Sequence, residues 1–551
     1  MPSPATIVVE FRGRRRSVDP DRPLTTSLTD DQLPRLQRSV RYHRPRSPFC
    51  GVGYCTQCLI RVNGVPNVRA CRYRPRSGDV IETENAWPSP RHDLLGVLDV
   101  VFSRGIDTVH GFRRPAFLTP LYHRVVRRLA GYGTLPKDRG RLPAFASRRE
   151  PADVLIVGGG TAGGRAVRTL TEAGASILVV DREGLSGTGP PEVAARTSTV
   201  VFLPPRSPTG DRPFHAVVGD GAGAGWAIDA KSVILAPGGY DANLVFTGND
   251  RPGVLTAEAA ERLVADPKRP PFRHAITVGG GTRALDMLHR FGPHIEAVVA
   301  PGSIEPEVTR AASDLGVPLY PRTLVLSASG RSRIRSVRLR ARGGSANPFS
   351  LTTDTVLLAH RRLPSVQLFF QAGARMHWDA AIGHYLPDHD ADGRTTIPGL
   401  FAVGEAAGYG EPSSAEESGA RAARAIVSGL DPWTPPSSPG PSSRPSDLET
   451  YYREVRGSLG QTGKCVVCPC EDVLWSEVEE AHRAGYRGIE VIKRFTGAGT
   501  GLCQGRYCIP ELLLLLAPLE NRPAPEVGYI TQRPPVVPVS LSALARLPEG
   551  D

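Results

Sequence analysis

The sequence predicts an α/β protein built from several domains. Its 551 residues are too many for one hydrophobic core, and length alone suggests three or four domains. Two segments, near 153–181 and 274–299, each read as strand, glycine-rich turn, helix and strand, which is typical of a dinucleotide-binding lobe. The nine cysteines fall into two groups near the chain ends. We therefore expect two Rossmann-like lobes between two small cysteine-bearing domains.

The composition is globular with a basic surplus. The net charge is +12, 40% of the residues are hydrophobic, and only five of the basic residues are lysines. The arginines are scattered over every segment instead of forming one stripe with stacking aromatics, which argues against a nucleic-acid partner and leaves an acidic protein partner open. No apolar stretch approaches the ~20 residues of a membrane span. The N-terminus has no apolar signal region, so we expect a cytoplasmic protein.

The first cysteine group lies in FCGVGYCTQC and the following NVRAC. Four residues separate Cys50 from Cys55, two separate Cys55 from Cys58, and twelve separate Cys58 from Cys71. A C-x4-C-x2-C run with a distant fourth cysteine is the plant-type [2Fe–2S] arrangement. Zinc is the alternative, but zinc modules usually build paired short knuckles. We predict a [2Fe–2S] cluster on these four thiolates and a ferredoxin-like β-grasp domain around it.

The first glycine turn has the full context of a dinucleotide site. In VLIVGGGTAGGRAV, residues Gly158, Gly160 and Gly163 form G-x-G-x-x-G between an apolar strand and a helix, and Asp181 follows twenty-one positions after Gly160. Such glycines allow a tight turn and a close approach of the backbone to pyrophosphate, while the acid binds ribose hydroxyls. These four residues are predicted to bind the cofactor.

Two later segments identify this cofactor as FAD. GLFAVGEAAGYGEP, which contains Gly404 and Glu405, is similar to the segment that closes the FAD site in flavoproteins with two dinucleotide domains, and VILAPGG resembles their middle crossover. These flavoproteins usually have Asp where this chain has Glu405, a residue that accepts a hydrogen bond from the ribityl chain. Glu keeps the acceptor on a longer side chain, so we expect binding with altered geometry.

The second glycine unit, ITVGGGTRALDML, is where NAD(P) would bind in such a fold. The next strand, IEAVVAPG, ends without the acidic residue that NAD requires, and no pair of arginines replaces it. A purely structural lobe, or one that binds another adenine nucleotide, fits better than a nicotinamide site. The region between the cysteine groups has no cysteine, which excludes dithiol–disulfide chemistry there.

The second cysteine group lies in CVVCPCEDV and GLCQGRYC. Cys468 and Cys470 form C-x-C, and Cys503 and Cys508 form C-x4-C after a gap of thirty-two residues. Four thiolates in two pairs at the ends of a short helical unit suit a second [2Fe–2S] cluster, with Cys465 as the spare thiol. Zinc remains the alternative, because this spacing is less diagnostic. Ser476 and Glu479 have the spacing of a capping box, which predicts the start of the first helix.

With these motifs, the chain resembles the alpha-subunit family of heteromeric amine and imino-acid oxidoreductases, which includes sarcosine oxidase alpha, opine oxidase, proline dehydrogenase and hydrogen cyanide synthase subunits. FCGVGYCTQC resembles a small ferredoxin subunit fused in front, and FTGNDRPGVLTA resembles the flavin domain. CPCED and GLCQGRYC are similar to the ligand motifs of the bacterioferritin-associated-ferredoxin type of domain. The folate-binding domain of sarcosine oxidase alpha has no counterpart here, so the resemblance does not extend to tetrahydrofolate chemistry.

The resemblance implies a role in electron transfer. In this family the amine is oxidised on another, amino-acid-oxidase-like flavoprotein subunit, and cofactors of the kind inferred here carry the electrons onward to a downstream acceptor. We find no acid–base constellation that would bind and deprotonate an amino acid, and we assign no catalytic residue. A stand-alone NAD(P)H-dependent reductase that feeds its own clusters is one alternative. A non-catalytic iron–sulfur scaffold is the other.

The expected domain order follows from these motifs. The predicted parts are a ferredoxin-like domain (1–95), a connecting segment (96–150), the first part of the FAD lobe (151–260), a second Rossmann-like lobe (261–375), the second part of the FAD lobe (376–430), a Pro/Ser-rich linker (431–460), a small helical [2Fe–2S] domain (461–515) and a tail (516–551).

Overall fold

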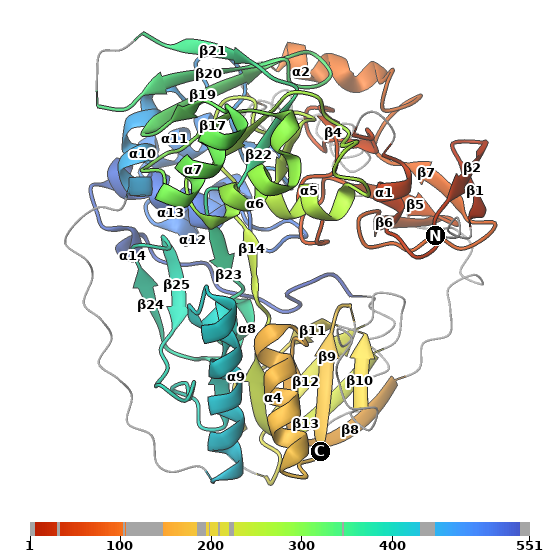
Figure 1. The fold of residues 1–551 in the computed structure, drawn as a ribbon, viewed down its shortest axis with the longest axis vertical. Helices are drawn as coiled ribbons and strands as arrows, with labels where there is room; N and C mark the ends of the chain where they lie inside the picture. Colours follow the sequence, from red (N-terminus) through yellow and green to blue (C-terminus); the bar gives the residue numbers. More distant parts are fainter. Residues whose placement is uncertain are drawn as a thin grey trace, which may run out of the picture. The chain divides into compact units, whose positions relative to one another are not determined.

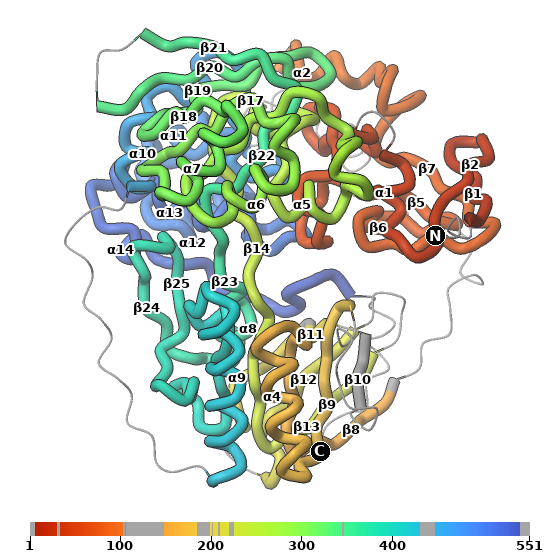
Figure 2. Tube along the Cα trace, viewed as in Figure 1, coloured from red at the N-terminus to blue at the C-terminus, as the bar shows by residue number. Residues whose placement is uncertain are grey.

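The structure is a computed structural model, and its chain divides into two compact units (Figures 1 and 2). The first unit comprises 1–139, 241–361 and 445–530, and the second comprises 140–240, 362–444 and 531–551. All nine cysteines lie in the first unit. The structure describes residues 6–29, 33–102, 105, 147–183, 194–197, 199–207, 210–219, 225–343, 347–429 and 447–539.

Some predicted segments lie outside the described residues. They are most of the connecting segment, the Pro/Ser-rich part of the linker and the end of the tail. The chain passes from the second unit to the first after Tyr240 and returns after Arg361, whereas the predicted lobe boundaries fall at 260 and 375. None of the described helices is long and apolar enough to cross a membrane.

A five-stranded mixed sheet forms the N-terminal part of the first unit. Its order is β2-β1-β7-β5-β6, with β1 parallel to β7 and the other pairs antiparallel. In the first strand Val9 is buried and Val8 is 48% exposed, the alternation expected of a sheet with one covered face. The strands are β1 (Ile7–Phe11), β2 (Arg14–Val18), β5 (Leu59–Val62), β6 (Val65–Arg69) and β7 (Val80–Thr83).

A parallel five-stranded sheet of order β15-β22-β16-β17-β18 forms the second layer of this unit. Strands β16 and β22 are buried along their whole length, as parallel strands covered on both faces must be. Helix α6 buries Ala284, Met287, Leu288 and Phe291, which share one helical face. The elements are β15 (Val254–Thr256), α5 (Ala257–Leu263), β16 (Ala275–Val278), α6 (Thr282–Phe291), β17 (Ile295–Val299), α7 (Pro306–Leu315), β18 (Leu319–Tyr320) and β22 (Thr355–Leu358).

The C-terminal part of the first unit is mainly helical. Its elements are α10 (Asp447–Val455), β27 (Val466–Cys468), β28 (Val473–Leu474), α11 (Trp475–Arg483), α12 (Ile489–Thr496), α13 (Ile509–Glu520) and α14 (Ala524–Val527). Helix α13 extends past the predicted domain end at 515, and the leucines at 512–516 are buried. An antiparallel meander of β19 (Thr323–Ser329), β20 (Ser336–Ala341) and β21 (Phe349–Thr352) completes the unit.

The predicted capping box of α11 is wrong. The helix begins at Trp475, and the Glu477 carboxylate accepts a hydrogen bond from the Leu474 backbone N–H at 2.7 Å. Because β28 pairs with β27 up to Leu474, the helix starts directly after this residue. The carboxylate three positions further on is then Glu477, which takes the role expected of Glu479.

The second unit is built on one mixed sheet of order β10-β9-β8-β13-β12-β11, with β26 also paired to β13. Strands β8, β9, β13 and β26 run parallel, so their carboxyl ends meet at one edge. The main elements are β8 (Ser147–Val157), α4 (Thr161–Glu172), β9 (Ile177–Asp181), β10 (Ala194–Thr197), β11 (Thr199–Phe202), β12 (Phe214–Gly219), β13 (Gly225–Leu235), α8 (Gln367–Ala372), β26 (Leu400–Ala402) and α9 (Pro412–Val427). Helices α4 and α9 lie side by side against the sheet (Figure 1).

A buried carboxylate joins the parts of the first unit. The side chain of Asp250 is only 1% exposed and accepts hydrogen bonds from Arg44 at 2.6 Å and from Arg46 at 2.7 Å. Arg46 also pairs with Asp472 of the C-terminal part. Burial would raise the pKa of Asp250, but the charges of Arg44 and Arg46 hold this pKa well below its ordinary value. The N-terminal part is thereby tied to both other parts of the unit.

We expect Asp250→Asn to destabilise the first unit by about 3–5 kcal/mol, because the buried guanidinium groups of Arg44 and Arg46 lose a charge partner that they share. Denaturant unfolding at pH 7 measures this loss, and Asp314→Asn, at an exposed position of α7, is the control. Since the pKa of Asp250 is depressed, its contribution is complete above about pH 4 and is lost as the pH falls further. The difference between wild type and variant should therefore shrink in acid; a difference that grows would contradict the assignment.

Candidate cofactor sites

The first glycine turn lies at the carboxyl edge of the second unit's sheet. It connects β8 to α4, and the Gly158 N–H donates to the Val180 carbonyl at 2.9 Å. Gly158 has φ +103°, a conformation that residues with a side chain rarely adopt. At Gly160, the N-cap of α4, an added Cβ would meet no atom within 4 Å. The turn is therefore closed toward the protein and open at the helix start, which fits a pyrophosphate group.

The predicted ribose acid lies beside this turn. Asp181 ends β9, and its carboxylate accepts hydrogen bonds from the Gly159 N–H at 2.8 Å and from the Glu183 N–H at 2.7 Å. Both bonds hold the carboxylate at the carboxyl edge of the sheet, where a bound ribose would lie in such a fold.

The late glycine segment reaches the same edge. Gly404 follows β26 and donates its backbone N–H to the Ser418 hydroxyl at 2.9 Å. A Cβ added to Gly404 would lie only 2.9 Å from the Ala162 Cβ of α4. The short helix η5 (Gly404–Ala407) therefore packs against the first turn of α4. The structure thus brings together all six residues predicted to bind the flavin, which are Gly158, Gly160, Gly163, Asp181, Gly404 and Glu405.

Glu405 has a partner that the sequence did not suggest. Arg362, in β23 (Arg362–Pro364), binds its carboxylate through two nitrogens, at 2.5 and 3.0 Å. An added Cβ at Gly239, in the VILAPGG crossover, would come 2.7 Å from the same carboxylate. The crossover and the late glycine segment therefore meet at Glu405. No sequence motif marks Arg362, which is distant from Glu405 along the chain.

The second glycine turn is closed by the chain itself. It connects β16 to α6, and the Glu305 N–H donates to the Gly280 carbonyl at 2.8 Å. An added Cβ on Gly281, the N-cap of α6, would lie 2.9 Å from the Glu305 carboxylate. A carboxylate at a helix N-terminus occupies the position that favours a phosphate. The chain itself therefore supplies a carboxylate at the N-terminus of α6.

The four N-terminal cysteines converge in a buried site. All four thiols are at most 2% exposed, and hydrogen bonds join Cys50 to Cys55, Cys50 to Cys71, and Cys58 to Cys71. Gly51 lies in this loop with φ +67°. A Cβ added to Gly51 would lie only 2.8 Å from the Ala259 Cα. Burial would raise the pKa of Cys50, but hydrogen bonds from Cys55 and Cys71 lower it well below the ordinary value.

The four C-terminal cysteines converge in the same way. A hydrogen bond joins the free thiols of Cys468 and Cys508, the latter at the start of α13. Another hydrogen bond joins the free thiols of Cys470 and Cys503. The hydrogen bond from Cys470 lowers the pKa of Cys503 to about 7, against the effect of burial. Cys465 lies apart from these pairs: its pKa is raised by burial and by Asp250 and Glu479, not by another cysteine.

The chemistry of the donors fits a cluster with two irons. In the part of the chain that the structure describes, no group of three or more His, Cys, Asp or Glu side chains has the geometry to hold one metal ion. The C-terminal thiols approach one another in two pairs, the N-terminal thiols form one chain of contacts, and a [2Fe–2S] cluster takes four thiolates over two irons. Both cysteine sites therefore have the ligand number and type that such a cluster needs.

Comparison with known domains agrees with this arrangement. Residues 5–86 match a 2Fe-2S iron-sulfur cluster binding domain, 209–426 match a pyridine nucleotide-disulphide oxidoreductase domain, and 462–546 match a sarcosine oxidase A3 domain. These matches support iron–sulfur and flavin cofactors. The combination of the three domains is the one expected of the alpha-subunit family.

Curated relatives point to the same family. The alpha subunit of sarcosine oxidase from Rhizobium meliloti (strain 1021) is 26% identical over 92% of this chain and 54% of its own length. An opine oxidase subunit from Agrobacterium tumefaciens (strain Ach5) is 26% identical over 72% of this chain and 92% of its own. The chain is a relative of the alpha subunits of heteromeric sarcosine and opine oxidases. It spans about half the length of the sarcosine oxidase relative that it matches.

A solved structure shows the same fold. The crystal structure of L-proline dehydrogenase from P. horikoshii aligns over 98% of both chains with a TM-score of 0.65 and 18% sequence identity. At this identity the likeness concerns the fold alone. The sequence-based expectation of a multidomain α/β fold is confirmed at that level.

The glycine turn allows a matched pair of substitutions. The Gly158 carbonyl oxygen occupies the space of a Cβ on Gly163, whereas a Cβ on Gly164 would lie at an ordinary 3.5 Å from the Gly159 oxygen. We expect Gly163→Ala to destabilise the second unit by about 1–3 kcal/mol. Gly164→Ala, in the same helix, should be neutral or stabilising by up to about 1 kcal/mol. Denaturant unfolding compares the two, and equal effects would contradict this packing.

Proposed function

We propose that this chain is the electron-transfer subunit of a multi-subunit dehydrogenase or oxidase that acts on amines or imino acids. The observation that carries the proposal is the combination of one open dinucleotide turn with two convergent four-cysteine sites. A flavin exchanges electrons in pairs and an iron–sulfur cluster accepts them singly, so the combination suits the conversion of two-electron into one-electron steps.

FAD would be held by the second unit. The backbone from Gly158 to Gly160 and the N-terminus of α4 would bind the pyrophosphate, and Asp181 would bind the ribose. Gly404 keeps its segment close to α4, and Glu405, fixed by Arg362, would face the flavin side of the site. When bound, FAD supplies the redox chemistry, and the residues of this chain orient it.

The iron–sulfur clusters would be held by the first unit. Cys50, Cys55, Cys58 and Cys71 would bind the N-terminal cluster, and Cys468, Cys470, Cys503 and Cys508 the C-terminal one. In this assignment the N-terminal sheet is a β-grasp ferredoxin-like domain, and the helical part that follows the linker is a second, smaller iron–sulfur domain. Cys465 stays outside both.

The substrate amine would be oxidised on an amino-acid-oxidase-like partner, from which the electrons pass through this chain to an acceptor. The relatives are named as subunits of sarcosine oxidase and of opine oxidase, so each is one part of a larger enzyme. Sarcosine, proline, opines and glycine are the substrate classes to examine, and the cytoplasm is the proposed location. The Glu305 carboxylate at the second glycine turn disfavours NAD(P)H as the electron source.

Stopped-flow spectroscopy separates this role from that of a stand-alone reductase. Purified chain mixed with NADH or NADPH should keep its flavin oxidised. Mixed with the right amine in the presence of its co-expressed partner, it should show rapid loss of flavin absorbance. Rapid bleaching by NADH without a partner would overturn the proposal, and iron–sulfur clusters without any bound flavin would favour a non-catalytic scaffold.

Metal analysis tests the cysteine assignment. We expect about four irons and no zinc per chain in protein purified without oxygen, and about two irons in Cys71→Ser or in Cys508→Ser. Cys465→Ser is the matched control, because it removes a buried thiol that contacts neither site, and it should keep the full iron content. Stoichiometric zinc in either site would contradict the assignment.

A further inference from the structure

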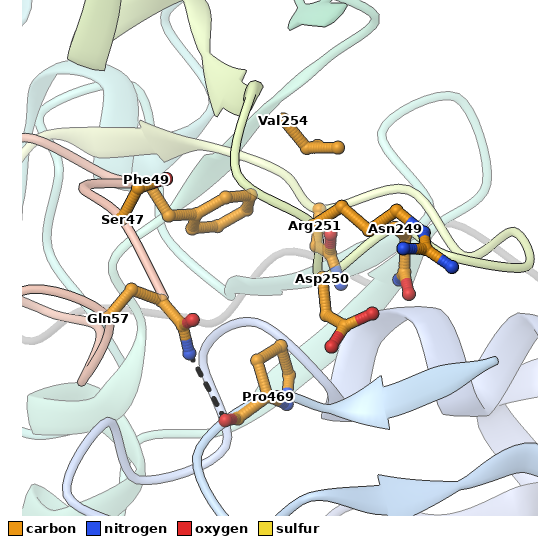
Figure 3. A pocket seen from close by; sticks show the side chains of 9 residues that line it. Ser47, Phe49, Gln57, Asn249, Asp250, Arg251, Val254 and Pro469 are labelled. Atoms are coloured by element: carbon orange, nitrogen blue, oxygen red, sulfur yellow. Dashed lines mark hydrogen bonds between the residues drawn. The ribbon is translucent and has the colours of Figure 1, made fainter. Parts of the chain in front are cut away.

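The two cysteine sites lie next to each other in the first unit. The Gln57 side-chain amide donates to the Pro469 carbonyl at 3.1 Å, as Figure 3 shows. Gln57 lies between two predicted ligands of the N-terminal site, Cys55 and Cys58, and Pro469 lies between Cys468 and Cys470. The ligand loop of one site therefore touches that of the other.

A second bond goes directly to a ligand. Thr56, which follows Cys55 and is 3% exposed, donates its hydroxyl hydrogen to the Cys470 sulfur. Its own carbonyl accepts a hydrogen bond from the buried Gln37 side chain, which fixes the peptide. Cys55 and Cys470 are thus connected by the covalent bonds between Cys55 and Thr56 and by one hydrogen bond.

The contacts of Thr56 and Gln57 with Cys470 and Pro469 form a seam between the two ligand loops, and aromatic contacts complete it. The Arg506 guanidinium lies 4.4 Å from the centre of the Tyr54 ring, and Phe49 packs edge-on against Tyr507 at 5.3 Å. Arg506 also donates to the Cys503 carbonyl at 3.0 Å. The two ring contacts each pair a residue of the N-terminal ligand loop with a residue between Cys503 and Cys508.

The seam is closed to solvent and held by charge. A small cavity beside it is lined by residues of all three parts of the unit, among them Phe49, Gln57 and Pro469 (Figure 3). Asp250, which also lines this cavity, holds Arg46, and Arg46 in turn pairs with Asp472, two residues after Cys470. The same ion pairs that stabilise the unit therefore fix the distance between the two sites.

We infer that the two cysteine sites work as one electron-transfer pair, with Thr56 and Gln57 as the connection between them. The inference rests on the proposed function, since it requires a cluster in each site. With both clusters bound, transfer of one electron would oxidise the donor cluster by one unit and reduce the acceptor cluster by one unit; the reduced flavin would resupply the donor, and no covalent bond would form or break. Electron tunnelling becomes much slower with each through-space gap, and this path has a single hydrogen bond in place of a gap.

Electron paramagnetic resonance of the dithionite-reduced full chain tests the pairing without any activity assay. Two nearby reduced clusters should give a spectrum with splitting or broadening from magnetic interaction. Cys71→Ser and Cys508→Ser should each give a simple spectrum of one cluster. If the wild-type spectrum equals the sum of these two, both clusters exist but are not paired, and the inference is overturned. If iron analysis finds only one cluster, the proposed function fails together with it.

Thr56→Val tests the connection itself, with Thr500→Val as the matched control. Thr500 is exposed and donates its hydroxyl to the Gly497 carbonyl and not to a cysteine sulfur. A hydrogen bond to a ligand sulfur stabilises the reduced cluster, so Thr56→Val should lower the reduction potential of the C-terminal cluster and slow electron equilibration between the two. Iron content should stay unchanged in both variants. Unchanged potentials in Thr56→Val would show that Thr56 does not connect the sites.

Discussion

The Asp250 carboxylate is the constraint on which the first unit depends. An isolated carboxylate or guanidinium is costly to bury, and the mutual contacts of Asp250, Arg44 and Arg46 offset much of that cost. Asp250 belongs to the segment before the parallel sheet, the arginines belong to the N-terminal part, and Arg46 extends the contact to Asp472 in the C-terminal part. Three segments separated by about two hundred residues each are therefore held in one arrangement. Because the two cysteine loops lie next to Arg46 and Asp472, their positions depend on the same ion pairs.

The two glycine turns share one motif but differ in what lies in front of the helix N-terminus. Both connect a buried parallel strand to a helix, and both place a glycine at the helix N-cap. At Gly160 the space in front of the helix is open, whereas at Gly281 the Glu305 carboxylate fills it. The same electrostatic preference of a helix N-terminus for an anion is met by a cofactor in one proposal and by the protein in the other.

Local spacing predicted much of the candidate sites, because their geometry is local. Cys50, Cys55 and Cys58 lie in one loop, and the turn from Gly158 to Gly163 is a single strand-to-helix connection. Sequence reasoning failed where a partner comes from far along the chain. The carboxylate that caps α11 belongs to Glu477 instead of Glu479, since strand pairing sets the helix start. The partner of Glu405 is Arg362, which comes from β23.

The sequence by itself predicted the candidate ligand sets, the order of the lobes and the family, because these predictions depend on residue type and spacing. Only the tertiary structure decided that the second glycine turn is closed by Glu305 and that the two cysteine groups, near opposite ends of the chain, are neighbours. Such contacts arise from packing between distant segments, and no local periodicity encodes them. The hydrogen bond from Thr56 to Cys470 is of this kind: no motif marks Thr56 in its own segment, and its role follows from the cysteine that lies opposite.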